Sequence, residues 1–163
     1  MPDKRVLADR SPVHLPTGEV VAAIGWHRWW IQRFEVFDPI GAVVASCLSS
    51  GFFRRRYLVR TPESRPVLEL TPVGFTQTRL QATVGTGTPI TVTRARRWSD
   101  RYYEFHGAAG IVGRVTPSTH GFTFHPDSYV VEMLQPAMSA LEVISLAHTV
   151  RLVAQSQRAA ASS

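Results

Sequence analysis

Arginine side chains are the clearest candidates for binding chemistry in this chain of 163 residues. Lys and Arg together number 18, Lys4 is the only lysine, and the formal net charge is +6. The basic residues gather in two clusters: Arg54, Arg55, Arg56 and Arg60 form the first, and Arg94, Arg96 and Arg97 form the second. Guanidinium groups bind phosphate through paired hydrogen bonds, so either cluster would suit a lipid headgroup or a nucleic-acid backbone. The alternative is a solvated Arg-rich surface that protects strand edges.

A second chemical feature is the aromatic segment Trp26-His27-Arg28-Trp29-Trp30. Indole rings favour the headgroup region of a membrane, so Trp26, Trp29 and Trp30 would suit an interfacial anchor or a contact with a protein partner. Interleaved aromatic and basic side chains also stack on single-stranded bases. The structural alternative is that Trp29 packs into one end of the fold.

The sequence has no pattern typical of catalysis or of metal binding. A Gly-x-Ser-x-Gly motif is absent, and the glycines at 85 and 87 are not followed by the Lys-Thr pair of a phosphate-binding loop. The six histidines show no ligand spacing, since His120 and His125 would point to opposite faces of a strand. Cys47, the single cysteine, is expected to be a buried apolar residue. We therefore expect a non-enzymatic protein without a metal or another cofactor.

Short apolar runs bounded by Gly, Pro, Asp or Ser predict the strands that would position these side chains. The runs cover 19–24, 31–37, 42–48, 52–60, 66–70, 75–84, 89–98, 102–106, 111–115, 120–125 and 128–133. Residues 84–88 predict a hairpin turn, because glycine adopts positive φ readily. The pattern of residues 34–43 recurs at a constant offset in residues 103–112, and it predicts stacked β-hairpins in a meander.

At Pro136 the short runs separated by turn residues give way to a continuous hydrophobic segment. This segment predicts a single helix from Pro136 to about residue 158. Ser139 and Glu142 have the spacing of a capping box. Apolar residues fall on nearly every face, which is typical of a helix that protein encloses or that spans a bilayer. Glu142, His148 and Arg151 interrupt the apolar run and favour enclosure, with His148 hydrogen-bonded inside.

These elements predict a mainly β (α+β) fold, an antiparallel closed β-barrel of about 10–12 strands wrapped around one hydrophobic C-terminal helix. Residues 1–17 are polar and are expected to form a flexible N-terminal lead-in, and residues 18–160 are expected to form the single domain. No transmembrane span is expected.

The repeated hairpins, the segment 127–131 and the final hydrophobic helix together resemble the tubby C-terminal-like superfamily. The nearest branch is that of the LURP-one-related and phospholipid-scramblase-like proteins, and the resemblance covers about residues 18–158. It implies a barrel around a central C-terminal helix and a binding function at phosphoinositides, phospholipid membranes or calcium. The sequence departs from that implication in two respects: Asp100, Glu104 and Asp127 do not form a calcium loop, and no Lys-Arg phosphoinositide pair is present.

The leading hypothesis is a non-enzymatic binding domain of the scramblase or LURP-one type that contacts anionic phospholipid or a protein partner through surface Arg and Trp residues. The alternative is a nucleic-acid-binding β-barrel. A lipid carrier with an open cavity is a third hypothesis, which a helix that fills the barrel would oppose. The N-terminal residues contain no apolar signal-peptide core, so a cytoplasmic location, peripheral to the membrane, is expected.

Overall fold

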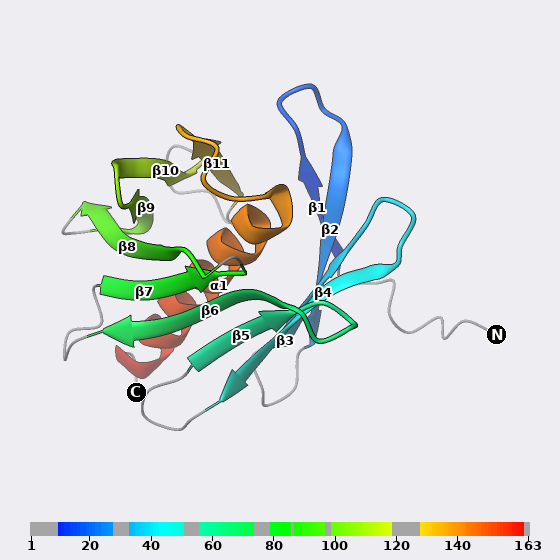
Figure 1. Ribbon diagram of the computed structural model, residues 1–163, viewed down its shortest axis with the longest axis horizontal. Helices are drawn as coiled ribbons and strands as arrows, with labels where there is room; N and C mark the ends of the chain where they lie inside the picture. Colours follow the sequence, from blue (N-terminus) through cyan, green and yellow to red (C-terminus); the bar gives the residue numbers. More distant parts are fainter. Residues whose placement is uncertain are drawn as a thin grey trace.

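The fold is an antiparallel sheet of eleven strands with one C-terminal helix (Figure 1). A computed structural model describes residues 10–27, 33–50, 56–73, 79–85, 87–96, 99–118 and 128–161, except for the side chains of His27 and Asp100. The strands are β1 (Arg10–His14), β2 (Val20–His27), β3 (Arg33–Phe37), β4 (Val43–Ser50), β5 (Arg56–Arg60), β6 (Pro66–Val73), β7 (Arg79–Val84), β8 (Pro89–Arg96), β9 (Ser99–Gly107), β10 (Gly110–Pro117) and β11 (Tyr129–Met133). Their order in the sheet is their order in the sequence, which confirms the predicted meander.

The core lies between the concave face of the sheet and the helix. Successive residues of a strand point to opposite faces, so in β5 Tyr57 and Val59 are buried while Arg56 and Arg60 are exposed. The same alternation buries Phe34 and Val36 of β3. Fully buried side chains from the strands and the helix include Tyr57, Phe34, Phe105, Leu68, Leu70, Ile90, Leu146 and Val150. The strands themselves were predicted from short apolar runs bounded by turn residues.

The helix α1 (Ala140–Ala161) begins later than the predicted start at Pro136. Its first residue is set by the capping box, a prediction that is confirmed. The backbone N–H of Glu142 donates to Ser139 Oγ at 3.3 Å, and the N–H of Ser139 donates to Glu142 Oε2 at 2.7 Å. Glu142 Oε1 accepts a further hydrogen bond, at 3.1 Å, from the N–H of Gly85 in the β7–β8 turn. The first turn of α1 is thereby tied to the sheet.

The prediction of a closed barrel is wrong. The sheet curls around α1, but its edge strands β1 and β11 pair only with β2 and β10 in the described part of the chain, so the sheet stays open (Figure 1). The physical reason lies in the helix, which is not buried on every side. One stripe at helical spacing stays partly or fully exposed, and it consists of Ala140, Ile144, Ala147, Arg151, Gln155 and Arg158. The sheet covers the buried faces of the helix without closing into a barrel.

The edge strand β1 was not predicted. It lies within the segment 1–17 that we expected to be a lead-in, and its Pro12 has no N–H to donate, which suits an edge position. The predicted strand 120–125 falls outside the described residues. No helix in the described ranges combines the length and the apolar character needed to cross a bilayer.

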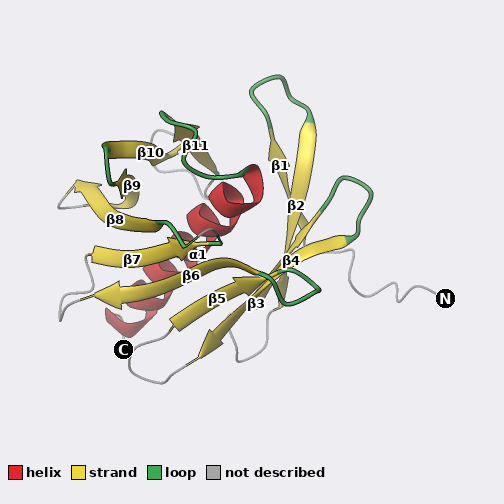
Figure 2. Ribbon diagram, in the orientation of Figure 1, coloured by secondary structure: helices red, strands yellow, loops and turns green. Residues whose placement is uncertain are grey.

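The connections of the meander fall alternately at two ends of the sheet. The turns after β1, β3, β5, β7 and β9 lie at the end where α1 begins, and Figure 2 shows them as loops. Gly41 and Gly110 occupy matching places in two of these turns, with φ of 93° and 117°, where a side chain would be strained. They belong to the sequence repeat, so that repeat corresponds to two equivalent hairpins, β3–β4 and β9–β10.

Candidate functional site

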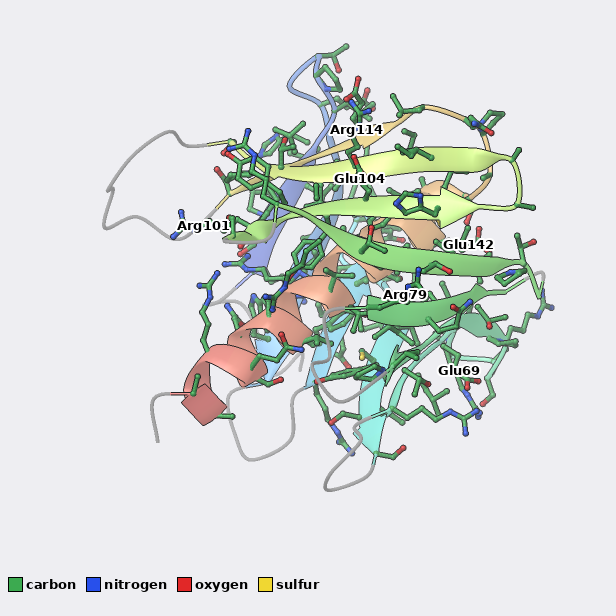
Figure 3. The ribbon with its side chains drawn as sticks, turned by 90° about the vertical axis from the view of Figure 1, so that its left-hand side faces the viewer. Glu69, Arg79, Arg101, Glu104, Arg114 and Glu142 are labelled. Atoms are coloured by element: carbon green, nitrogen blue, oxygen red, sulfur yellow. The ribbon has the colours of Figure 1, made fainter. Side chains whose placement is uncertain are left out.

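Charge is distributed unevenly between the two ends of the sheet. Arginines occur in or next to the strand termini at the end where α1 finishes, and they are Arg10, Arg33, Arg56, Arg79, Arg94, Arg96, Arg101 and Arg158. Glu19, Asp38 and Glu63 lie at the opposite end, as does Glu142 in the first turn of α1, and Arg60 and Arg65 are the arginines that accompany them in the described turns. In Figure 3, Arg101 lies on the side of the C-terminal turns of α1 and Glu142 lies toward the other side. We call the Arg-rich end, defined by these eight residues, the basic end.

Several arginines of the basic end are engaged within the protein. Arg94 Nη2 donates a hydrogen bond to Gln157 Oε1 in α1 at 2.8 Å. The guanidinium of Arg96 lies 4.1 Å from the centre of the Tyr102 ring, and Arg56 forms an ion pair with Glu69. The side chains of Arg33 and Arg79 are exposed and form no hydrogen bond or ion pair with any other described residue. These two side chains are therefore the most available for an external anion.

The structure separates the two Arg clusters named from the sequence. Arg56 and Arg60 project from the outer face of β5, whereas Arg94 reaches the helix on the inner side of β8. Arg56, Arg94 and Arg96 nevertheless share the basic end, while Arg60 lies beside the β5–β6 turn at the other end. The remaining predicted site residues lie outside the described residues, and they are Arg54, Arg55, Arg97, Trp29 and Trp30.

Trp26, the remaining member of the aromatic segment, lies in a cluster that the sequence did not indicate. Its ring centre is 4.1 Å from that of His148 in α1, and the ring of Phe34 meets the same imidazole at 4.6 Å. The guanidinium of Arg151 lies 5.8 Å from the Trp26 ring and 5.1 Å from the ring of Tyr129. We call Trp26, Phe34, Tyr129, His148 and Arg151 the seam cluster, because it joins β2 and β11 across the opening between the two sheet edges.

The seam cluster contains polar atoms that are buried without a hydrogen-bond partner. His148 is 7% exposed and its Nε2 has no partner, so the prediction that the helix histidine is hydrogen-bonded is wrong for this nitrogen. Burial, reinforced by the positive charge of Arg151, lowers the pKa of His148 to about 3. The imidazole is therefore neutral near pH 7. The Nε of Arg151 is also buried and unpartnered.

Nucleophilic and metal chemistry find little support in the described residues. Cys47 is buried, as predicted, and desolvation raises the pKa of its thiol to about 12, against a smaller opposing effect of a hydrogen bond with Thr149. A thiol with such a pKa is a poor nucleophile near pH 7. No group of three or more His, Cys, Asp or Glu side chains suited to a metal ion occurs in the described ranges.

Comparison with family models, with curated proteins and with solved structures found no match. The resemblance to the tubby C-terminal-like superfamily therefore stays a prediction.

Proposed function

We propose that this protein is a non-enzymatic binding domain whose basic end contacts an anionic phospholipid surface. The observation that carries the proposal is the excess of Arg at one end of the sheet, because at the other end only Arg60 and Arg65 accompany the carboxylates of the described turns. A molecule with this charge distribution is attracted to an anionic surface in one orientation, with the basic end toward it.

The charge pattern of the outer sheet face favours a lipid surface over nucleic acid. A strand of nucleic acid needs a continuous basic track. On β9 and β10, however, Glu104 lies 3.8 Å from Arg114 and 3.4 Å from His106, and Glu69 pairs with Arg56. Carboxylates thus interrupt the basic side chains on this face, and the largest excess of positive charge is at the basic end.

The sequence segments rich in aromatic and basic residues are connected to the same end. The described residues that flank them are His27 and Arg33, Ser50 and Arg56, and Arg96 and Ser99, and all are strand termini at the basic end. Aromatic residues combined with arginines are typical of proteins that bind at the membrane interface. This combination supports a membrane rather than a soluble polyanion.

Vesicle co-sedimentation tests the proposal, with phosphatidylcholine vesicles that either contain or lack phosphatidylserine. Binding is expected only with phosphatidylserine and is expected to weaken as salt is raised. The variant Arg33→Gln/Arg79→Gln/Arg96→Gln should bind on the order of a hundredfold more weakly, because each arginine near an anionic surface contributes about 1 kcal/mol.

A matched control is Arg60→Gln/Arg65→Gln/Arg114→Gln, which removes the same charge from the opposite end and the outer face. It should bind nearly as well as the unaltered protein. Equal losses in the two triple variants would show that net charge alone acts and would overturn the proposed orientation. Binding to a single-stranded oligonucleotide without binding to either vesicle would replace the lipid function by the nucleic-acid alternative.

A further inference from the structure

The seam cluster presents a cation for which the described residues supply no anion. The side chain of Arg151 is only partly buried and forms no ion pair or hydrogen bond with any described residue. Glu142, the one carboxylate in α1, caps the helix, and Glu104 on β9 faces Arg114 and His106. A half-desolvated guanidinium without a counter-ion is costly unless an external anion approaches it.

We infer that Arg151 binds the phosphodiester of a single anionic phospholipid, whose apolar part packs on the neighbouring helix stripe. The inference rests on the proposed function and identifies the residue that receives one lipid molecule. A phosphodiester carries one negative charge, which matches one guanidinium, and its two free oxygens accept paired N–H bonds.

The rings around Arg151 hold its guanidinium in place for this contact. The guanidinium lies 5.8 Å from the Trp26 ring centre and 5.1 Å from the Tyr129 ring centre, so cation–π attraction favours a position near both β2 and β11. His148 packs beside Trp26 and stays neutral, so it adds no second charge beneath Arg151. A positioned guanidinium loses less side-chain freedom on binding than a flexible one.

Apolar surface continues from Arg151 toward the start of α1. Ala147 and Ile144 precede Arg151 by four and seven residues and therefore share its side of the helix. Both pack against the core yet remain partly exposed on the stripe that the sheet leaves open. An acyl chain next to the bound phosphodiester would cover this stripe, whereas a free phosphate ion would leave it exposed.

The position of the cluster within the fold connects it to the basic end. Trp26 is next to the last residue of β2, and Tyr129 is the first residue of β11. Both positions lie at the end of the sheet where α1 finishes, the end that carries Arg33 and Arg79. A lipid held at Arg151 would thus enter from the surface on which the proposed function depends.

A soluble, monomeric lipid separates this site from general attraction to a surface. Dihexanoylphosphatidylglycerol below its micelle concentration is titrated into the full chain by calorimetry, and inorganic phosphate and hexanoate are titrated in parallel. Arg151→Gln should raise the Kd for the lipid at least about tenfold, because a charge-assisted hydrogen-bond pair is lost. Arg151→Lys, which keeps the charge without the paired geometry, should give an intermediate Kd and guards against a folding defect in the Gln variant. Arg65→Gln, which removes one charge from the opposite end, should leave the Kd unchanged.

The outcomes distinguish this inference from the proposed function. An unchanged lipid Kd in Arg151→Gln, while the protein still binds phosphatidylserine vesicles, overturns the inference and leaves the proposed function standing. Failure of the unaltered protein to bind those vesicles overturns the proposed function itself. Inorganic phosphate binding as tightly as the lipid would show an ion site without an acyl contribution, and hexanoate binding as tightly would show a carboxylate site; either result overturns the inference.

Discussion

Acid sensitivity of the fold should depend on His148. This imidazole packs between Trp26 and Phe34 with Arg151 nearby, and no carboxylate is among these neighbours. Its pKa falls from the ordinary 6.5 to about 3, chiefly because burial disfavours the charged form. Replacing His148 with Leu removes the titrating group and puts an apolar side chain of similar volume in its place. The stability of the variant should therefore depend less on pH.

The sign and size of the effect follow from proton linkage. As pH falls below 6.5, the unfolded chain binds a proton at His148 while the native protein does not, so acid favours unfolding until about pH 3. Each pH unit in this interval costs about 1.4 kcal/mol. Between pH 7.5 and pH 4.5 the unaltered protein should thus lose about 3 kcal/mol of unfolding free energy through this residue. The native imidazole is still neutral at pH 4.5, so the unfolding free energy lost at that pH depends on the pKa of His148 in the unfolded chain.

Urea denaturation at pH 7.5 and pH 4.5, followed by tryptophan fluorescence and circular dichroism, measures this effect. The relevant quantity is the difference between the unaltered protein and His148→Leu in the stability lost on acidification, because other groups titrate equally in both. His14→Asn, at an exposed position of β1, should keep the full pH dependence. If His148→Leu loses as much stability as the unaltered protein, His148 is protonated or well solvated in the native state, and our account of the seam cluster is wrong.

Two further predictions concern the contact between α1 and the β7–β8 turn, and both are measured by urea denaturation at pH 7.5. Glu142→Ala removes the capping carboxylate together with its hydrogen bond to the N–H of Gly85, so it should lower the free energy of unfolding by about 2 kcal/mol. The control Glu132→Ala, at an exposed position of β11, should change that free energy little. Gly85→Ala would bring a Cβ within 2.5 Å of the carbonyl oxygen of Pro66, so it should lower the free energy of unfolding by about 1–3 kcal/mol. Unchanged stability in Glu142→Ala or in Gly85→Ala would refute the described turn geometry.

Local features of the fold could be predicted from the sequence because neighbouring residues determine them. The capping box depends on Ser139 and Glu142 alone, and the 84–88 turn depends on Gly87, whose φ is 83°. The strands were predicted from short apolar runs between turn residues, and the run 52–60 contains β5. The strand β1 escaped notice because Arg10, Ser11, Pro12 and His14 leave it almost no apolar residues.

The closure of the sheet could not be predicted in the same way. Closure requires β1 and β11 to pair, and these strands come from opposite ends of the chain. The helix sequence did contain a signal against it, since Arg151 and Arg158 share a helical stripe with Ile144 and Ala147. Because the helix was predicted to be apolar on nearly every face, neither this exposed stripe nor the seam cluster around Arg151 was expected.

The open sheet and the charge distribution together indicate which arginines can act on an external ligand. Composition alone gives a basic protein, but Arg94 is bound to Gln157, Arg56 is paired with Glu69, and Arg96 lies on Tyr102. The C-terminal carbonyl groups of α1 add partial negative charge at the same end, which offsets part of the positive potential there. Arg33 and Arg79 are exposed without a side-chain partner, Arg96 is exposed and keeps its charge beside Tyr102, and Arg151 lies at the opening, so these four side chains should account for most of any binding energy. A closed barrel would have buried Arg151, so the opening in the sheet is the feature that makes this guanidinium accessible.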